Sequence, residues 1–304
     1  MNVVVVGAGG LGSYIGSVLA DAGHEVVLVT RGAHRSAIES HGLRVQSHAG
    51  DFTTWPTCVG SALELPGADL TFVATKTFSL PEVAPQLKHL AERGSGVVSL
   101  LNGVTALERL AEQGIPTDSC ADGVAYMTSF RVAPGVVERK AAHQRIVVGR
   151  DSPVAPDVCD AFAGTIVEIE QATDIRVELW EKMAVVCSLT VLCAIADRTM
   201  GSLRTHRFGA DLQRAAIAEV LAVGRARGVP IPDDGERRID ETLDRFPDDF
   251  FPSVIHDLNG GRRTEMDDLG ATVSRLGRES GIVTPLHDAG TLIVQLAESA
   301  AQPR

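Results

Sequence analysis

The chain has no excess of positive charge, no long apolar run and no clustered cysteines, and each absence excludes a class of protein. Its 304 residues carry 28 lysines and arginines against 39 aspartates and glutamates, so the formal net charge is −11 at pH 7. This balance argues against general binding to nucleic acid or to anionic membranes, and we expect neither partner. The longest apolar stretch, residues 183–196, is too short and too mixed in composition to span a bilayer.

Disulfides, metal ligands and hydrolase motifs are also missing. The five cysteines are odd in number and scattered, so we expect buried, reduced thiols in a cytoplasmic protein. No basic segment and cleavage site precede the first expected strand, and we expect no secretory signal peptide. The nine histidines lack metal-ligand spacing, and no serine lies in a nucleophile-elbow context. Neither a metal site nor a hydrolase is therefore expected.

The N-terminus, in contrast, carries a sequence typical of a dinucleotide-binding unit. Valines at residues 3–6 predict a buried strand that leads into Gly-x-Gly-x-x-Gly, here Gly7-Ala8-Gly9-Gly10-Leu11-Gly12. A helix and a second strand, residues 26–29, follow. We expect Gly7 to permit the turn, Gly9 to let a pyrophosphate approach the backbone, and Gly12 to let the helix pack closely. The helix N-terminus would then face the phosphates. The alternative is a structural strand–turn–helix without a ligand.

The end of the second strand narrows the choice of cofactor. NAD and FAD sites usually place a carboxylate there to hold the ribose 2′-hydroxyl, but this chain has Thr30-Arg31. A planar guanidinium suits a 2′-phosphate, because it donates charge-assisted hydrogen bonds. The sequence therefore predicts NADP(H) in preference to NAD(H). An ordinary solvated loop arginine is the alternative for Arg31.

The pattern along the chain predicts an α/β N-terminal Rossmann-type dinucleotide-binding domain, residues 1–172, and an all-α C-terminal domain, residues 173–304. Expected strands after the first two cover residues 43–46, 52–58 (the two as a hairpin), 70–74, 96–101, 124–132, 136–138, 145–149 and 165–169. Expected helices after the first cover residues 33–41, 81–93, 105–113, 156–164, 177–196, 207–228, 236–246, 254–259, 264–281 and 287–300. Lys76 and Asn102 follow strands, where ligands of such folds usually bind.

Several short motifs, in order over nearly the whole chain, resemble those of the ketopantoate reductase (2-dehydropantoate 2-reductase) family. Beyond the glycine segment and Arg31, they are Thr75-Lys76, Asn102-Gly103, Leu179-Trp180-Glu181-Lys182-Met183, Ser253 and Arg263-Thr264-Glu265-Met266-Asp267. The resemblance implies NADPH-dependent reduction of a small 2-keto acid to a D-2-hydroxy acid. The sequence leaves the oligomeric state open, and a homodimer is compatible with it.

The resemblance also implies roles for individual residues. Lys182 would match the catalytic lysine, whose ammonium can stabilise a developing alkoxide and donate its proton. Glu265 would match the active-site glutamate, which favours the charged lysine and also lies at the cofactor. Asn102 and Ser253 would bind substrate or orient the nicotinamide, and Lys76 would hold cofactor phosphates. Read without the resemblance, Lys76 and Lys182 are solvated lysines, Asn102 belongs to a turn, and Glu265 lies in the first turn of a helix.

Three positions depart from the family pattern. The family carries asparagines four and eight residues after the lysine, and another in a Pro-Asn-Gly segment; here these positions are Val186, Thr190 and Met200. The first two would line the substrate site on one helix face. A more apolar 2-keto acid, branched or aromatic, is therefore at least as good a candidate as ketopantoate. Reduction of another carbonyl or an imine, and a non-catalytic NADP(H)-binding protein, are the remaining alternatives.

Overall fold

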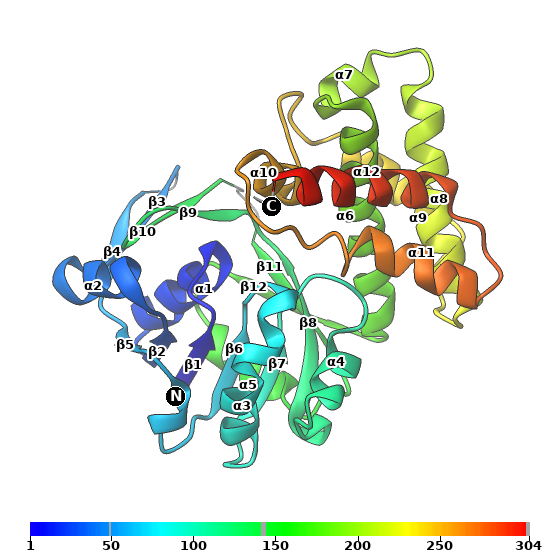
Figure 1. Ribbon diagram of the computed structural model, residues 1–304. Coiled ribbons are helices and arrows are strands. Elements are labelled where there is room, and N and C mark those ends of the chain that lie inside the picture. The colour runs from blue at the N-terminus through cyan, green and yellow to red at the C-terminus, as the bar shows by residue number, and fades with distance from the viewer. Residues whose placement is uncertain (49, 141–143, 302–304) are drawn as a thin grey trace. The chain divides into compact units, whose positions relative to one another are not determined.

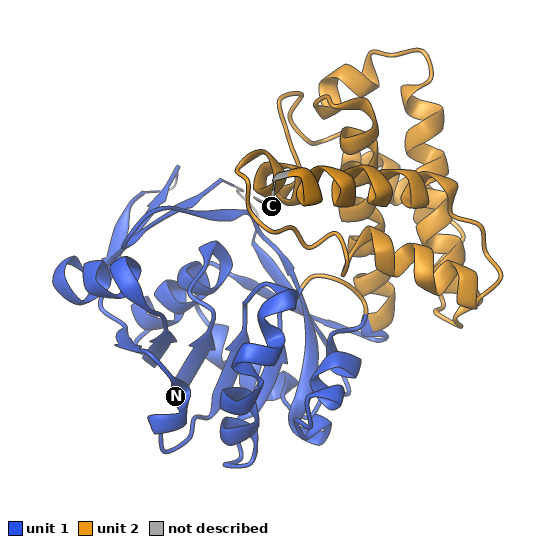
Figure 2. Cartoon of the chain, viewed as in Figure 1, with its two compact units in different colours: residues 1–101, 105–175 blue, residues 102–104, 176–304 orange. Residues whose placement is uncertain are grey.

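The computed structural model describes residues 1–48, 50–140 and 144–301 (Figure 1). The chain divides into two compact units (Figure 2). Unit 1 comprises Met1–Leu101 and Thr105–Ile175, and unit 2 comprises Asn102–Val104 and Arg176–Arg304. The short segment that begins at Asn102 therefore belongs with the C-terminal unit, although it directly follows the strands of unit 1.

Unit 1 is built on an eight-stranded sheet in the order β12-β11-β8-β7-β6-β1-β2-β5. The strands are β1 (Asn2–Val6), β2 (Glu25–Val29), β5 (Thr57–Val59), β6 (Leu70–Val73), β7 (Gly96–Ser99), β8 (Cys120–Tyr126), β11 (Arg145–Gly149) and β12 (Glu168–Ala172). All neighbouring pairs are parallel except β8 and β11. Because β2 and β6 flank β1, the strand order reverses direction at β1, which is where ligands of doubly wound folds bind.

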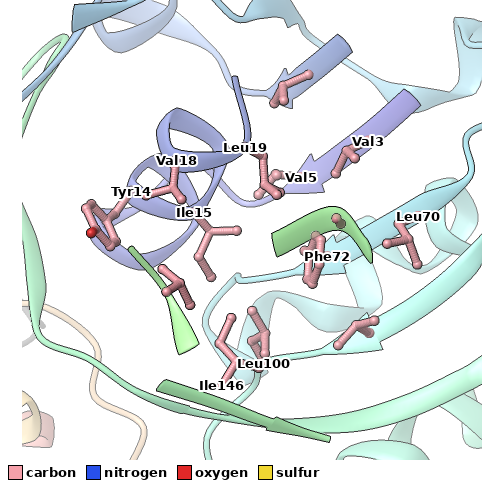
Figure 3. Packing of buried hydrophobic residues seen from close by; sticks show 14 of the residues in the cluster. Val3, Val5, Tyr14, Ile15, Val18, Leu19, Leu70, Phe72, Leu100 and Ile146 are labelled. Carbon is pink, nitrogen blue, oxygen red and sulfur yellow. The ribbon is translucent and has the colours of Figure 1, made fainter. Parts of the chain in front are cut away.

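Helices cover both faces of this sheet. They are α1 (Gly10–Asp21), α2 (Gly32–His41), α3 (Leu80–Ala91), α4 (Ala106–Glu112) and α5 (Ala155–Phe162), with short 3-10 helices η1 (Ala62–Glu64), η2 (Thr77–Ser79) and η3 (Thr117–Ser119). Val3 and Val5 pack in one hydrophobic cluster with α1, as Figure 3 shows, whereas Val4 and Val6 pack in a second cluster with α3 and α4. Both faces of β1 are buried, which explains its unbroken run of valines.

A second, four-stranded sheet has the order β4-β3-β10-β9. Its strands are β3 (Leu43–Ser47), β4 (Phe52–Thr54), β9 (Ser129–Ala133) and β10 (Val136–Arg139). The expected hairpin forms only in part, because residues after Pro56 leave β4 and form β5, which pairs with β2 in the main sheet. The expected strand 124–132 is likewise wrong, since it divides into β8 and β9 in different sheets. The expected strand 165–169 lies three residues later, as β12.

Unit 2 consists of helices in the part of the chain that the structure describes. They are α6 (Ile175–Ala196), α7 (Met200–Arg204), α8 (Gly209–Ala226), α9 (Gly235–Leu243), α10 (Ser253–Asn259), α11 (Gly270–Glu279) and α12 (Pro285–Ala301). Helix α7 was not expected. Two glycines allow close packing on α6: a Cβ at Gly224 would lie 2.9 Å from the Trp180 ring, and one at Gly290 would lie 2.4 Å from Val191 Cβ. The expected α/β unit followed by a helical unit is confirmed.

Helix α6 corrects the expectation about membrane spans. It runs for 22 residues, so by length and composition it could cross a membrane, contrary to the estimate from residues 183–196. The helix is longer than the apolar stretch because it begins at Ile175 and includes charged residues before residue 183. Of its most apolar window, 61% is buried inside the protein, where Cys187, Val191 and Cys193 join the hydrophobic core of unit 2. Burial of this kind is typical of a core helix.

Candidate functional site

The glycine segment of unit 1 has the geometry of a phosphate-binding turn. Gly7 has φ +104°, and a Cβ there would lie 2.7 Å from Ala74 and Thr75 backbone atoms. A Cβ at Gly12 would lie 2.0 Å from the Gly7 carbonyl oxygen, whereas a Cβ at Gly9 would meet no atom within 4 Å. Gly7 and Gly12 are thus required by packing. Gly9 faces open space, where a ligand could approach its backbone.

The surroundings of this turn also suit a phosphate. Helix α1 begins without a side-chain cap and without an acidic residue in its first turn, so its N-terminal N–H groups are open to an anion. The hydroxyls of Thr75 and Ser129 are buried and have no hydrogen-bond partner among the described residues. Ser129 begins β9, and its carbonyl oxygen would lie 2.2 Å from a Cβ at Gly10. Sequence reasoning gave Gly10 no such packing role, because β9 lies far away along the chain.

Arg31 and Lys76 lie at the carboxyl ends of the two strands that flank β1. Arg31 follows β2 and precedes α2; its Nε donates to Gly60 O at 3.0 Å, and its Nη1 pairs with Glu82 Oε1 at 2.9 Å. Lys76 follows β6 and precedes η2. Ala8 is buried and Leu11 partly buried in the core of unit 1, so these two side chains are occupied by packing.

Lys182 lies in helix α6 of unit 2, next to residues whose side chains are buried or ion-paired. Leu179, Trp180 and Met183 are buried, and Glu181 forms an ion pair with Arg238 of α9. Burial lowers the pKa of Lys182 to about 8, while the negative charge of Glu265 acts in the opposite direction. The other four side chains of the motif are therefore engaged in packing or in an ion pair. The Lys182 ammonium is partly desolvated and interacts with the Glu265 carboxylate.

Glu265 is almost fully buried, at 2% exposure, and accepts a hydrogen bond from Asn102 Nδ2 at 3.4 Å. The structure therefore brings Lys182, Glu265 and Asn102 together within unit 2. It does not place Glu265 in the first turn of a helix, because α11 begins only at Gly270. Residues 265–269 form turns, with Leu269 N donating to Glu265 O at 3.1 Å, and the backbone of Leu269 (φ −107°, ψ −98°) is not helical.

Helix α12 and Gly103 hold this turn in place. Thr264 donates from its backbone N and its Oγ1 to the carboxylate of Glu298, at 3.1 and 2.9 Å. Gln295 Nε2 donates to Asp267 Oδ1 at 2.7 Å. Gly103 has φ +107°, and a Cβ there would lie 3.1 Å from Asp268 O. Sequence reasoning missed Glu298, because nothing local relates it to a residue 34 positions earlier.

The other expected substrate residues have different surroundings. Ser253 is the exposed first residue of α10, and no hydrogen bond joins it to Lys182 or Glu265 among the described residues. Thr190 is fully buried, and its Oγ1 donates to the Val186 carbonyl oxygen at 2.7 Å. Met200 is fully buried in the core of unit 2, against which Val186 also packs. Position 200 is therefore a packing position in this structure.

A doubly wound unit with a glycine-rich turn before its first helix, and a helical unit with a half-buried lysine opposite a buried glutamate, define the class of two-domain oxidoreductases. The sequence families described as "Ketopantoate reductase PanE/ApbA" and "Ketopantoate reductase PanE/ApbA C terminal" match residues 3–153 and 174–298. The chain belongs to the ketopantoate reductase family.

Individual relatives match over the whole length. The 2-dehydropantoate 2-reductase of Halobacterium salinarum is 30% identical, with 98% of this chain and 99% of that protein covered. A solved ketopantoate reductase of Ralstonia eutropha JMP134 has a TM-score of 0.91 at 30% identity, with both chains fully covered. D-mandelate dehydrogenase, solved with NADH and anilino(oxo)acetate, has a TM-score of 0.89 at 22% identity over 99% of both chains. At that identity the likeness shows a shared fold.

Proposed function

We propose that this chain reduces a 2-keto acid to the corresponding D-2-hydroxy acid with NADPH. The observation that carries the proposal is the juxtaposition of Lys182 and Glu265 in the helical unit of a ketopantoate reductase family member. Partial removal of an ammonium from water is costly unless a carboxylate compensates it, so the half-buried Lys182 opposite Glu265 indicates chemistry better than a solvated surface lysine does. A non-catalytic NADP(H)-binding protein would not need it.

Lys182 acts as the general acid in this proposal. The reduced nicotinamide supplies the hydride to the carbonyl carbon. Negative charge then develops on the carbonyl oxygen, and the Lys182 ammonium stabilises it and donates the proton that completes the hydroxyl group. With a pKa of about 8, the side chain is mostly charged at neutral pH and yet is a better proton donor than a solvated lysine. The neutral amine afterwards takes a proton from water.

Glu265 and Asn102 prepare this donor. The Glu265 carboxylate opposes the loss of the lysine proton that burial favours. The amide of Asn102 holds one carboxylate oxygen, and Glu298 fixes the neighbouring Thr264. Asn102 and the exposed Ser253 would bind the substrate's carboxylate and carbonyl oxygens.

The cofactor would be held by unit 1. The glycine turn suits its diphosphate, Lys76 would contribute a positive charge there, and Arg31 replaces the carboxylate that NAD sites usually carry. These residues favour NADPH. The structural neighbour that binds NADH makes it necessary to compare both cofactors directly.

A more apolar substrate than ketopantoate is the second candidate. Val186, Thr190 and Met200 replace family asparagines, and the Thr190 hydroxyl donates within its own helix. The fold neighbour named D-mandelate dehydrogenase handles a 2-hydroxy acid with an aryl group, which makes an aromatic 2-keto acid a reasonable test substrate. Another carbonyl or an imine remains the alternative within enzymes.

The proposal is tested by measuring NADPH oxidation with a panel of 2-keto acids that includes ketopantoate, branched and aromatic members. Oxaloacetate and simple ketones serve as controls, and NADH is run in parallel. Turnover with at least one monocarboxylic 2-keto acid, and none with simple ketones, is expected. Binding of NADPH without turnover of any carbonyl would favour the non-catalytic alternative.

The five free thiols of the structure agree with the cytoplasmic location that we propose.

A further inference from the structure

A surface pocket of about 380 Å³ lies in unit 1 between the start of α2 and the strand β9. Arg31, Ala33 and His34 line one side, and residues 131–134 line the other. Its volume is within the range of small-ligand sites. The same strand passes the phosphate-binding turn at Ser129, as described above. β9 therefore runs from the expected diphosphate position to the residue expected at the ribose.

The lining of this pocket is cationic. Two arginines and no carboxylate line it. Arg31 is partly neutralised by Glu82, whereas no carboxylate pairs with Arg131 among the residues that the structure describes. Helix α2 begins here without a side-chain cap and without an acidic residue in its first turn, so its dipole also favours an anion.

His34 fixes the position of the turn that follows β9 and adds no charge to the pocket. Gly135 N donates to His34 Nδ1 at 2.9 Å, so the proton lies on Nε2, which is 3.1 Å from Ser13 Oγ. Burial and the nearby Arg131 lower the pKa of His34 to about 4, so the ring is neutral at pH 7. His34 thus ties the β9–β10 turn to α1 and α2, and the pocket owes its positive charge to the two arginines.

We propose that Arg131 is a second ligand for the 2′-phosphate of NADP(H), acting with Arg31 across this pocket. The inference rests on the proposed preference for NADP(H). It differs from a requirement for Arg31 alone, because Arg31 already pairs with Glu82, whereas Arg131 on β9 pairs with no carboxylate in the described part of the chain. A dianionic phosphate between two guanidiniums gains charge-assisted hydrogen bonds from both sides. NAD(H), which carries a hydroxyl there, gains little.

The test is calorimetric binding of NADP⁺ and NAD⁺ to the full chain without substrate, for wild type and for Arg131→Gln, Arg131→Lys and Arg31→Gln. Arg93→Gln is the control, since this exposed arginine of unit 1 lies outside the pocket. Arg131→Gln should weaken NADP⁺ binding about ten- to hundredfold and leave NAD⁺ binding unchanged. Arg131→Lys should restore part of the loss, and the control should match wild type.

Each other outcome overturns the inference. Equal weakening for both dinucleotides would mean that Arg131 supports the fold or the diphosphate, and no weakening would mean that it does not touch the phosphate. Loss of selectivity in Arg31→Gln alone would leave Arg31 as the sole ligand. Because no substrate is present, failure of the proposed reduction would leave these results intact. Wild type that binds both dinucleotides equally would instead refute the NADP(H) preference itself.

Discussion

The pH dependence of reduction should report the protonation of Lys182. A general acid must carry its proton, so kcat/KM should be highest below the pKa of about 8 and fall as the pH rises through it. At pH 9, one unit above, only about one-tenth of the lysine is protonated, and the rate should fall about tenfold per further unit. Glu265 raises this pKa. Glu265→Gln should therefore move the descending limb to lower pH.

The assay is the initial rate of NADPH oxidation from pH 6 to 10 with saturating cofactor and the best 2-keto acid. Glu279→Gln is the matched control, because the Glu279 carboxylate of α11 pairs with Arg227 and Arg275 at the surface of unit 2. The descending limb of the pH profile of this control should coincide with that of wild type. A profile that stays flat to pH 10, or a Glu265→Gln limb at the wild-type position or higher, would refute the proposed coupling of the two side chains.

Three further predictions concern cofactor, positioning and substrate. Gly9→Ala should leave Tm unchanged, because the new Cβ meets no atom within 4 Å, and should raise the Kd for NADPH. Gly12→Ala should lower Tm, because its Cβ would lie 2.0 Å from the Gly7 carbonyl oxygen. Melting curves that are the same for the two variants would contradict this prediction. Glu298→Gln weakens the hold on Thr264, so it should destabilise the fold by about 1–3 kcal/mol in urea titrations and lower kcat with the KM for NADPH unchanged. A hydroxyl-free branched 2-keto acid should show a kcat/KM about tenfold above that of ketopantoate, since the hydrogen bonds of two family amides, at positions 186 and 190, are absent here. A preference for ketopantoate would show that other residues bind its hydroxyl.

Local patterns in the sequence are sufficient to predict much of the secondary structure of unit 1. The valine run of β1 alternates between two hydrophobic clusters, and the glycine turn follows it directly, so both features depend on neighbouring residues. The same holds for the long helix α6. Reasoning of this kind failed where pairing partners are distant. β5 leaves the expected hairpin for β2, and β9 lies against Gly10, because strand pairing depends on the whole sheet.

The candidate site shows the same division. The resemblance predicts Lys182 and Glu265 as site residues, but the local pattern wrongly predicts a helix from residue 264. The start of α11 is set by tertiary contacts, in which Glu298 binds Thr264 and a Cβ at Gly270 would lie 2.4 Å from the Met266 side chain. Likewise, the apolar residues 186 and 200 indicated a change in the substrate site, but only the structure shows that Met200 is consumed by the core.

The central claim is that Lys182 provides the proton for carbonyl reduction. Single-turnover reduction of the best 2-keto acid by Lys182→Met, followed by NADPH absorbance, tests it most directly when NADPH binding is measured on the same protein. We expect a rate about a hundredfold to ten-thousandfold below that of wild type, with an unchanged Kd for NADPH. A near-normal rate would contradict it, and so would a loss that arises entirely from weaker binding of NADPH.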